Sequence, residues 1–170
     1  STRIAAGPDA AGRTPEPQAE PAAIVVTFSG GVPAALNGVP LPLVELTTSL
    51  GTLASRHGVG PVRAGPLSCE AAAALILHAA HRDLTSAVSG PDVQALSSVA
   101  TAAYASLVED ARWFSPMREG LDAYVAAVQA PVSGHVHGRL SRGAFVITAT
   151  ELSLVPSGSL RPLVPSQTQH

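Results

Sequence analysis

Cys69 and Glu70 are the adjacent residues best suited to covalent or acid chemistry, and they stand directly before a run of alanines. Strong helix formers and apolar spacing predict a helix from Glu70 to about Val88, so the pair lies at a helix start. The free N–H groups and the dipole there would lower the pKa of a thiol. We predict that both residues act in catalysis and that Glu70 also contacts a ligand. The alternative is a small buried thiol beside a carboxylate that only stabilises the helix.

Two histidine pairs offer acid–base or ligand chemistry. His78 and His81 are three residues apart on one face of the same predicted helix. His135 and His137 share one face of a predicted strand. Imidazoles placed in this way can bind zinc or carry protons, but spacing alone specifies a metal poorly. We therefore predict no metal site and no cofactor, with His81 as a catalytic candidate and His78 as a ligand-binding one.

A third cluster flanks the junction between two predicted helices and comprises Arg112, Trp113, Arg118 and Glu119. An arginine that binds in bidentate fashion beside an aromatic ring can hold a carboxylate. Trp113 and Arg118 are therefore predicted ligand-binding residues. The alternative is a salt-bridged seam where two helices meet, with the indole placed there for packing.

The elements that must position these groups follow from apolar periodicity and from glycine and proline breaks. Predicted strands are Ile24–Phe28, Val32–Leu36, Val132–Leu140 and Ala144–Thr148. Predicted helices run from Pro42 to about Arg56, Glu70 to about Val88, Asp92 to about Trp113, and from Ser115-Pro116 to Pro131. Asn37-Gly38 closes the first hairpin with a residue pair suited to positive φ.

This order of hairpin, helices and hairpin predicts an α+β fold, in which an antiparallel sheet from two hairpins packs against about four helices. Residues 1–21 lack periodicity and are expected to be a flexible N-terminal arm. Residues 22–154 form the predicted domain. Residues 155–170 are a proline-rich tail that is ordered only if something holds it.

Composition limits the classes of function. Aromatic residues are 4% against 46% hydrophobic residues, so the core must consist of Ala, Val and Leu. Charged residues are 13%, about half the usual share, which indicates that a partner covers part of the surface. A net charge of -2 without a basic block argues against nucleic-acid binding. No apolar run is long enough to span a membrane, and Cys69 is the single cysteine, so we expect a cytoplasmic protein.

Several segments resemble the carboxy-terminal domain of argininosuccinate synthase, in the same order and over about residues 22–154. They are Val26–Gly38, Leu43–Leu46, Arg56–Gly60, His78–Arg82, Trp113–Glu119, Val132–Val136 and Leu140–Gly143. The resemblance implies the α+β fold and an association surface, hence a homo-oligomer. It also implies that the helix carrying His81 has a structural role, which is the alternative to a catalytic role for this histidine.

The sequence departs from this family in the interval that carries the family's substrate-binding run. Only Pro61–Leu75 separates Gly58-Val59-Gly60 from Ile76, and the family's Glu-Asn-Arg and Lys-Ser-Arg sequences have no counterpart. Cys69-Glu70 aligns with a Tyr-Glu pair, so a thiol replaces the phenol that meets the ureido substrate. Nothing resembles the family's Gly/Ser-rich pyrophosphate loop. The resemblance therefore implies a stand-alone domain without ATP-dependent ligase activity.

We consequently expect an oligomerising small-molecule-binding or scaffold protein, with or without a separate catalytic subunit. A repurposed enzyme of the cyclase or lyase type is the alternative, acting on an apolar small molecule in a specialised biosynthetic pathway. The C-terminal subunit of a split synthase is a further alternative. The sequence leaves open whether the chain is an enzyme.

Overall fold

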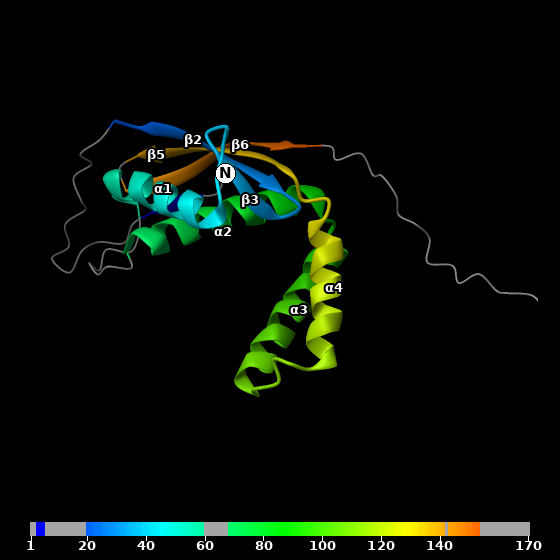
Figure 1. The fold of residues 1–170 in the computed structure, drawn as a ribbon. Coiled ribbons are helices and arrows are strands. Elements are labelled where there is room, and N and C mark those ends of the chain that lie inside the picture. Colours follow the sequence, from blue (N-terminus) through cyan, green and yellow to red (C-terminus); the bar gives the residue numbers. More distant parts are fainter. Residues whose placement is uncertain (1–2, 6–19, 60–67, 142, 154–170) are drawn as a thin grey trace, which may run out of the picture.

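The structure is a computed structural model that describes residues 3–5, 20–59, 68–141 and 143–153. Its strands are β1 (Arg3–Ala5), β2 (Ala22–Ser29), β3 (Val32–Leu36), β4 (Val39–Pro40), β5 (Gly134–Ser141) and β6 (Ala144–Leu152). Its helices are α1 (Leu43–Arg56), α2 (Ser68–Val88), α3 (Pro91–Glu109) and α4 (Pro116–Gln129). The predicted α+β class is confirmed (Figure 1).

The strands form one antiparallel sheet in the order β1-β6-β5-β2-β3-β4. The two predicted hairpins, β2–β3 and β5–β6, are both present and are joined where β2 pairs with β5. The predicted turn at Asn37-Gly38 has positive φ at both residues. The Asn37 side chain also accepts a hydrogen bond of 2.8 Å from the backbone N–H of Val25. Asparagine therefore ties the turn to the neighbouring strand as well as adopting its conformation.

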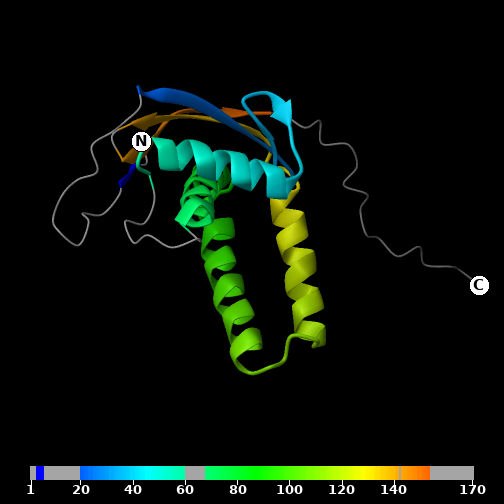
Figure 2. The ribbon, with the colours of Figure 1, turned by 60° about the vertical axis from the view of Figure 1, so that its left-hand side comes forward.

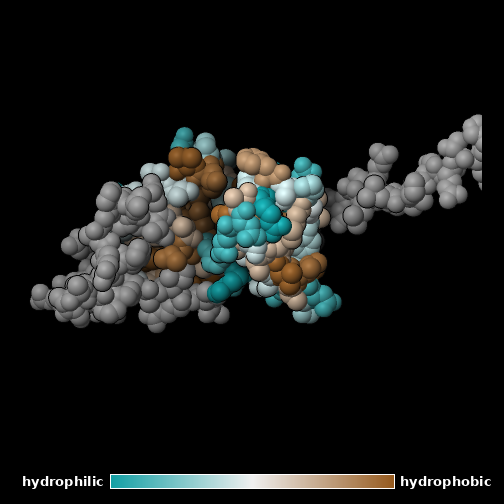
Figure 3. All heavy atoms as spheres, turned by 90° about the horizontal axis from the view of Figure 1, so that it is seen from below, coloured by the Kyte–Doolittle hydropathy of each residue, from teal (hydrophilic) through white to brown (hydrophobic). Residues whose placement is uncertain are grey.

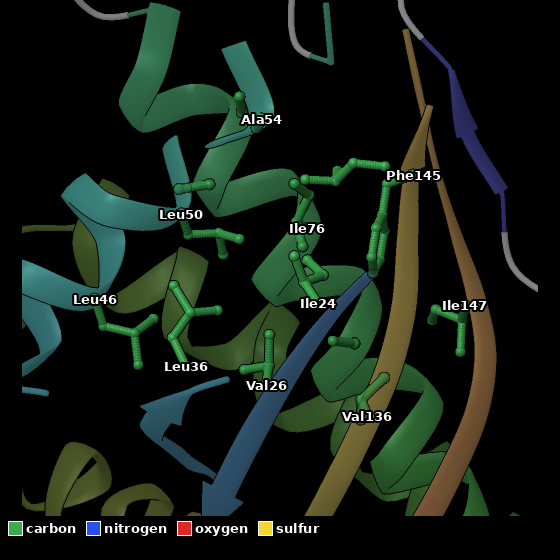
Figure 4. Packing of buried hydrophobic residues seen from close by; sticks show 14 of the residues in the cluster. Ile24, Val26, Leu36, Leu46, Leu50, Ala54, Ile76, Val136, Phe145 and Ile147 are labelled. Atoms are coloured by element: carbon green, nitrogen blue, oxygen red, sulfur yellow. The ribbon is translucent and has the colours of Figure 1, made fainter. Parts of the chain in front are cut away.

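Helices α1 and α2 cover one face of the sheet (Figure 1). Alternate residues of β2, including Ile24 and Val26, point into the layer between sheet and helices. Leu46 and Leu50 of α1 and Ile76 of α2 meet them there (Figure 4). The core contains the expected Ala, Val and Leu side chains, but the expectation that it consists of these alone is wrong, because Phe28, Phe145 and three isoleucines are also buried there. Its alanines lie mostly on α2, which allows that helix to approach the sheet closely.

Helices α3 and α4 form a hairpin that extends away from the sheet, so two of the four helices cover it (Figures 1 and 2). The predicted Ser115-Pro116 helix start is confirmed in position, but Ser115 makes no side-chain cap hydrogen bond. Helix α3 ends at Glu109, earlier than the predicted Trp113. Ala111 takes φ 54, which the chain needs in order to turn back towards α4.

The N-terminal arm differs from expectation at Arg3–Ala5, which forms β1 on the outer edge of β6. An edge strand presents unpaired N–H and C=O groups, and β1 satisfies those on β6 from Ala144 to Val146. The structure thus places these three residues in the sheet, whereas the sequence analysis includes them in the N-terminal arm. The predicted arm over residues 6–19 and the tail over 155–170 lie outside the described residues.

Gly138 lies at an irregularity in the β5–β6 pairing, directly against the ring of buried Phe145. A Cβ at residue 138 would fall well inside van der Waals contact with that ring. We expect Gly138→Ala to lower the free energy of unfolding by about 1–3 kcal/mol in urea titrations. Gly120→Ala is the matched control, since its Cβ would meet nothing within 4 Å in α4 and should stabilise by about 0.5–1 kcal/mol. Equal effects at the two glycines would contradict the packing.

Candidate functional site

The predicted site residues lie in two separate places. His78 and His81 are on α2, close to the root of the α3–α4 hairpin. Trp113 and Arg118 are at the hairpin's far tip, where α3 connects to α4 (Figure 2). The fold therefore does not bring the imidazoles together with the arginine–tryptophan pair.

Cys69 and Glu70 occupy the first turn of α2, as the sequence predicts. Their side chains lie outside the part of the molecule that the structure describes. Their roles as nucleophile and acid therefore stay predictions. Within the same helix, the buried face ahead of His78 carries Ala72, Ala73 and Ile76 into the core.

His78 and His81 line an open cleft of about 460 Å³ between α2, the first half of α3 and the end of α4. All the lining side chains are polar: His78, His81, Arg82, Thr85, Ser86, Ser89, Gln94, Ser97, Ser98, Thr101 and Gln129. The lining contains two imidazoles, a guanidinium, two amides and several hydroxyl groups, but no carboxylate. We call this feature the α2–α3 cleft.

The orientation of His81 is fixed from two sides. Its Nε2 lies 2.8 Å from Gln129 Oε1, and its ring lies 5.9 Å from the ring of buried Phe28, centroid to centroid. Gln129 in turn packs against Gly31, where a Cβ would overlap the amide oxygen and where φ is +78°. Glycine is therefore required at residue 31 both for space and for conformation. A turn between two strands thus sets the position of a side chain in the cleft.

At the hairpin tip, the Arg118 guanidinium lies 5.1 Å from the centre of the Trp113 ring. Arg118 Nε also lies 3.5 Å from Asp122 Oδ2, and Arg112 pairs with Asp110 at 2.8 Å. Because Arg118 already has a carboxylate partner, this arrangement favours the salt-bridged seam over a carboxylate-binding site. A ligand-binding role for Trp113 and Arg118 stays a prediction.

The second histidine pair lies on β5, on the sheet face away from the helices. His135 Nδ1 is 3.0 Å from the Thr27 hydroxyl, and His137 Nε2 is 3.4 Å from Glu151 Oε1. Over the described ranges, no group of three or more His, Cys, Asp or Glu side chains is placed to hold a metal ion. The same ranges contain no helix long and apolar enough to cross a bilayer.

The sequence reasoning missed the hydroxyl and amide groups of the α2–α3 cleft. These groups come from three helices, so no local spacing brings them together. A signal was present in the polar residues at helical spacing, Ser86 and Ser89 on α2 and Ser97 and Thr101 on α3. On a helix that is expected to pack against other elements, such a polar stripe indicates a face that contacts solvent.

Tyr104 near the tip donates a hydrogen bond of 2.5 Å to Asp122 Oδ1. This bond, desolvation and the negative charge of Asp122 raise the pKa of Tyr104, against an opposing effect from Arg118. The raised pKa belongs to the folded state. The contribution of Tyr104 to the free energy of unfolding is therefore complete below about pH 10, the pKa of a free tyrosine. It is lost as the pH rises through the pKa of Tyr104 in the folded state.

We expect absorbance titration of a Tyr124→Phe variant, which retains one phenol, to show Tyr104 ionising at a higher pH than a free tyrosine. Adding Asp122→Asn removes the anionic acceptor and should bring the midpoint down. Glu119→Gln is the control, because Glu119 is an exposed acid of the same helix that is not among the causes of the shift. An unchanged midpoint in Asp122→Asn would contradict the pairing.

Comparison with known proteins gives the family. The profile of the Arginosuccinate synthase C-terminal domain matches residues 10–155. The argininosuccinate synthase of Rubrobacter xylanophilus is 36% identical over 152 residues, covering 82% of this chain and 37% of that protein. The argininosuccinate synthase of Nostoc punctiforme is 36% identical over 137 residues, covering 75% of this chain and 34% of its own length. The chain spans about a third of the length of these curated relatives. It belongs to the argininosuccinate synthase C-terminal domain family.

Proposed function

We propose that this chain is an association module that pairs with a second copy of itself through the α3–α4 hairpin and does not bind a ureido substrate. The observation that carries the proposal is the burial of the hairpin. Helix α4 has no buried residue, and α3 buries only Ala100 and Leu107 among its described residues.

A helical hairpin with so few buried residues is only marginally stable on its own. Isolated helices of about 12–15 residues are marginal in water, and their stability in proteins comes from packing an apolar face. Several large apolar side chains of the hairpin are instead exposed: Leu96 52%, Val99 63%, Val108 63%, Phe114 96% and Met117 50%. Figure 3 views the molecule from the side on which the hairpin projects and shows brown apolar patches there beside hydrophilic side chains. A partner that covers this surface would supply the missing burial.

A second copy fits this surface for three reasons. The family resemblance implies an association surface, and the charged fraction of 13% leaves little of the chain's surface strongly hydrated. Leu96 and Val99 are three residues apart on α3, so they lie on one face and form a stripe. Two such hairpins related by a two-fold axis can bury both stripes in a four-helix arrangement. A separate catalytic subunit is the other possible occupant, and the test below distinguishes them.

The lack of ureido binding rests on the sequence around the start of α2. The interval between Gly60 and Ile76 has no counterpart of the family's substrate-binding run, and a thiol stands at residue 69 in place of the phenol. A site that loses a hydrogen-bonding hydroxyl and several charged contacts loses most of its binding free energy.

The alternative of an enzyme for an apolar substrate receives no support from the α2–α3 cleft. Every residue that lines it carries a polar group, and these groups can hydrogen-bond to a hydrated ligand. His81 keeps its place as a catalytic candidate only for a polar substrate.

Association should be visible as a dependence of mass and helicity on concentration. We expect light scattering to give twice the chain mass at high concentration and to fall towards the monomer on dilution. Circular dichroism at 222 nm should weaken over the same range, because the hairpin loses helix when its partner leaves. A constant monomer mass with constant helicity would overturn the self-association.

The interface can be located by substitution. The double variant Leu96→Ser with Val99→Ser should shift the dissociation midpoint to at least about tenfold higher concentration, because it removes two apolar side chains from the stripe. Val44→Ser is the control, since Val44 is 77% exposed but lies on α1. If only the control dissociates the protein, the interface is not the hairpin. A wild-type monomer that binds a nucleotide-binding subunit would identify the other occupant.

Binding of the ureido substrate can be tested separately. We expect titration calorimetry of the chain with citrulline to give no saturable heat at millimolar concentration. An argininosuccinate synthase such as the Rubrobacter relative serves as the positive control under the same conditions. Saturable citrulline binding by this chain would contradict the loss of the substrate run, whatever the state of association.

A further inference from the structure

We propose that the α2–α3 cleft binds a small hydroxylated organic anion, of the class of a sugar phosphate. This site is separate from the association surface, because Gln94, Ser97, Ser98 and Thr101 lie on one face of α3, whereas Leu96 and Val99 lie on the opposite face of the same stretch of helix. It also takes no part in the ureido chemistry implied by the family. The argument rests on charge, on unused donors, on available acceptors and on size.

The charge of the cleft is positive. Arg82 is exposed on its wall and has no ion pair among the described residues. Asp83, the neighbouring acid on α2, is turned to the other side, where its Oδ2 accepts a hydrogen bond of 2.7 Å from Thr150. No carboxylate lines the cleft. An anion placed there therefore meets a guanidinium with five free N–H donors and no like charge.

Further donors in the cleft are also unused. Gln129 presents its oxygen to His81 at 2.8 Å, so its amide NH₂ group remains free. His78 and Ser86 make no hydrogen bond within the described residues and both line the cleft. Charge-assisted hydrogen bonds from such donors to phosphate oxygens are stronger than neutral ones. This side of the cleft therefore offers more hydrogen-bond donors than acceptors, as the binding of an anion requires.

The opposite wall offers acceptors instead. Ser98 donates its hydroxyl proton to the carbonyl oxygen of Gln94 at 3.1 Å, and Thr101 donates to Ser97 at 2.9 Å. With their protons committed, both hydroxyl oxygens can only accept. Donors that they can pair with are hydroxyl groups of a ligand. A molecule with an anionic end towards α2 and hydroxyl groups towards α3 therefore satisfies both walls.

The size of the cleft agrees with such a molecule. Its volume of about 460 Å³ falls within the range of roughly 300–1,000 Å³ typical of small-molecule sites. His81 is held by Phe28 and Gln129 before any ligand arrives, so little of the binding free energy is needed to order this side chain.

Titration calorimetry with glucose 6-phosphate, citrate, inorganic phosphate and glucose tests the proposal on the intact chain. We expect saturable binding of glucose 6-phosphate, weaker binding of citrate and inorganic phosphate, and none of glucose. Arg82→Gln should weaken glucose 6-phosphate binding by at least about tenfold. Arg139→Gln is the matched control, because Arg139 is exposed on β5 and unpaired within the described residues. It should change the affinity by less than about twofold.

Ser98→Ala tests the acceptor wall and should reduce the advantage of glucose 6-phosphate over inorganic phosphate, leaving phosphate binding itself unchanged. The proposal is overturned if no anion binds saturably, if glucose binds as well as its phosphate, or if the two arginine variants lose affinity equally. Light scattering of the same samples reports association independently. A failure of anion binding therefore leaves the association proposal standing, and the converse also holds.

Discussion

The burial of one face of α2 against the sheet is the interaction on which the rest of the structure depends. Ala73, Ile76, Ala80 and Leu84 lie fully buried along that face. Because the face repeats every three to four residues, the opposite side of the helix must turn outward. That outward side carries His78 and Arg82 to the cleft, and His81 lies at its edge, where its ring also contacts buried Phe28. One face of α2 thus packs into the core with small side chains, and another face of the same helix lines the candidate site.

The elements of the fold could be read largely from sequence because their signals are local. Asn37-Gly38, the alternation around Ile24 and Val26, and the proline at residue 116 each determine a turn, a strand or a helix start through their own backbone chemistry. The edge strand at Arg3–Ala5 has no such signal, since it depends on the unpaired edge of a strand far along the chain. The missing cap at Ser115 also shows that a favourable residue type does not guarantee the bond.

The arrangement of the hairpin and the cleft could not be predicted in the same way. Apolar spacing predicts that Leu96, Val99 and Met117 lie on apolar helix faces, and the structure leaves these side chains exposed; the spacing does not say what covers them. The cleft combines Ser98 of α3 and Gln129 of α4 with residues of α2, and only the tertiary structure brings these three helices together. Resemblance to the family supplied the fold, whereas the polar wall arises from details of packing that the resemblance does not carry.

The contacts around Gly30 and Gly31 have a mechanical consequence. The backbone N–H of Gly31 bonds to the carbonyl of Val132 at 2.7 Å, and that of Gly30 to the Ser133 hydroxyl at 2.9 Å. These bonds anchor the segment that follows α4 to a strand turn, while α3 is attached at its own base through Gly90. The chain that leaves α4 is thus fixed to the β2–β3 turn by two hydrogen bonds, so a change in the tilt of the hairpin would have to break them or move the turn.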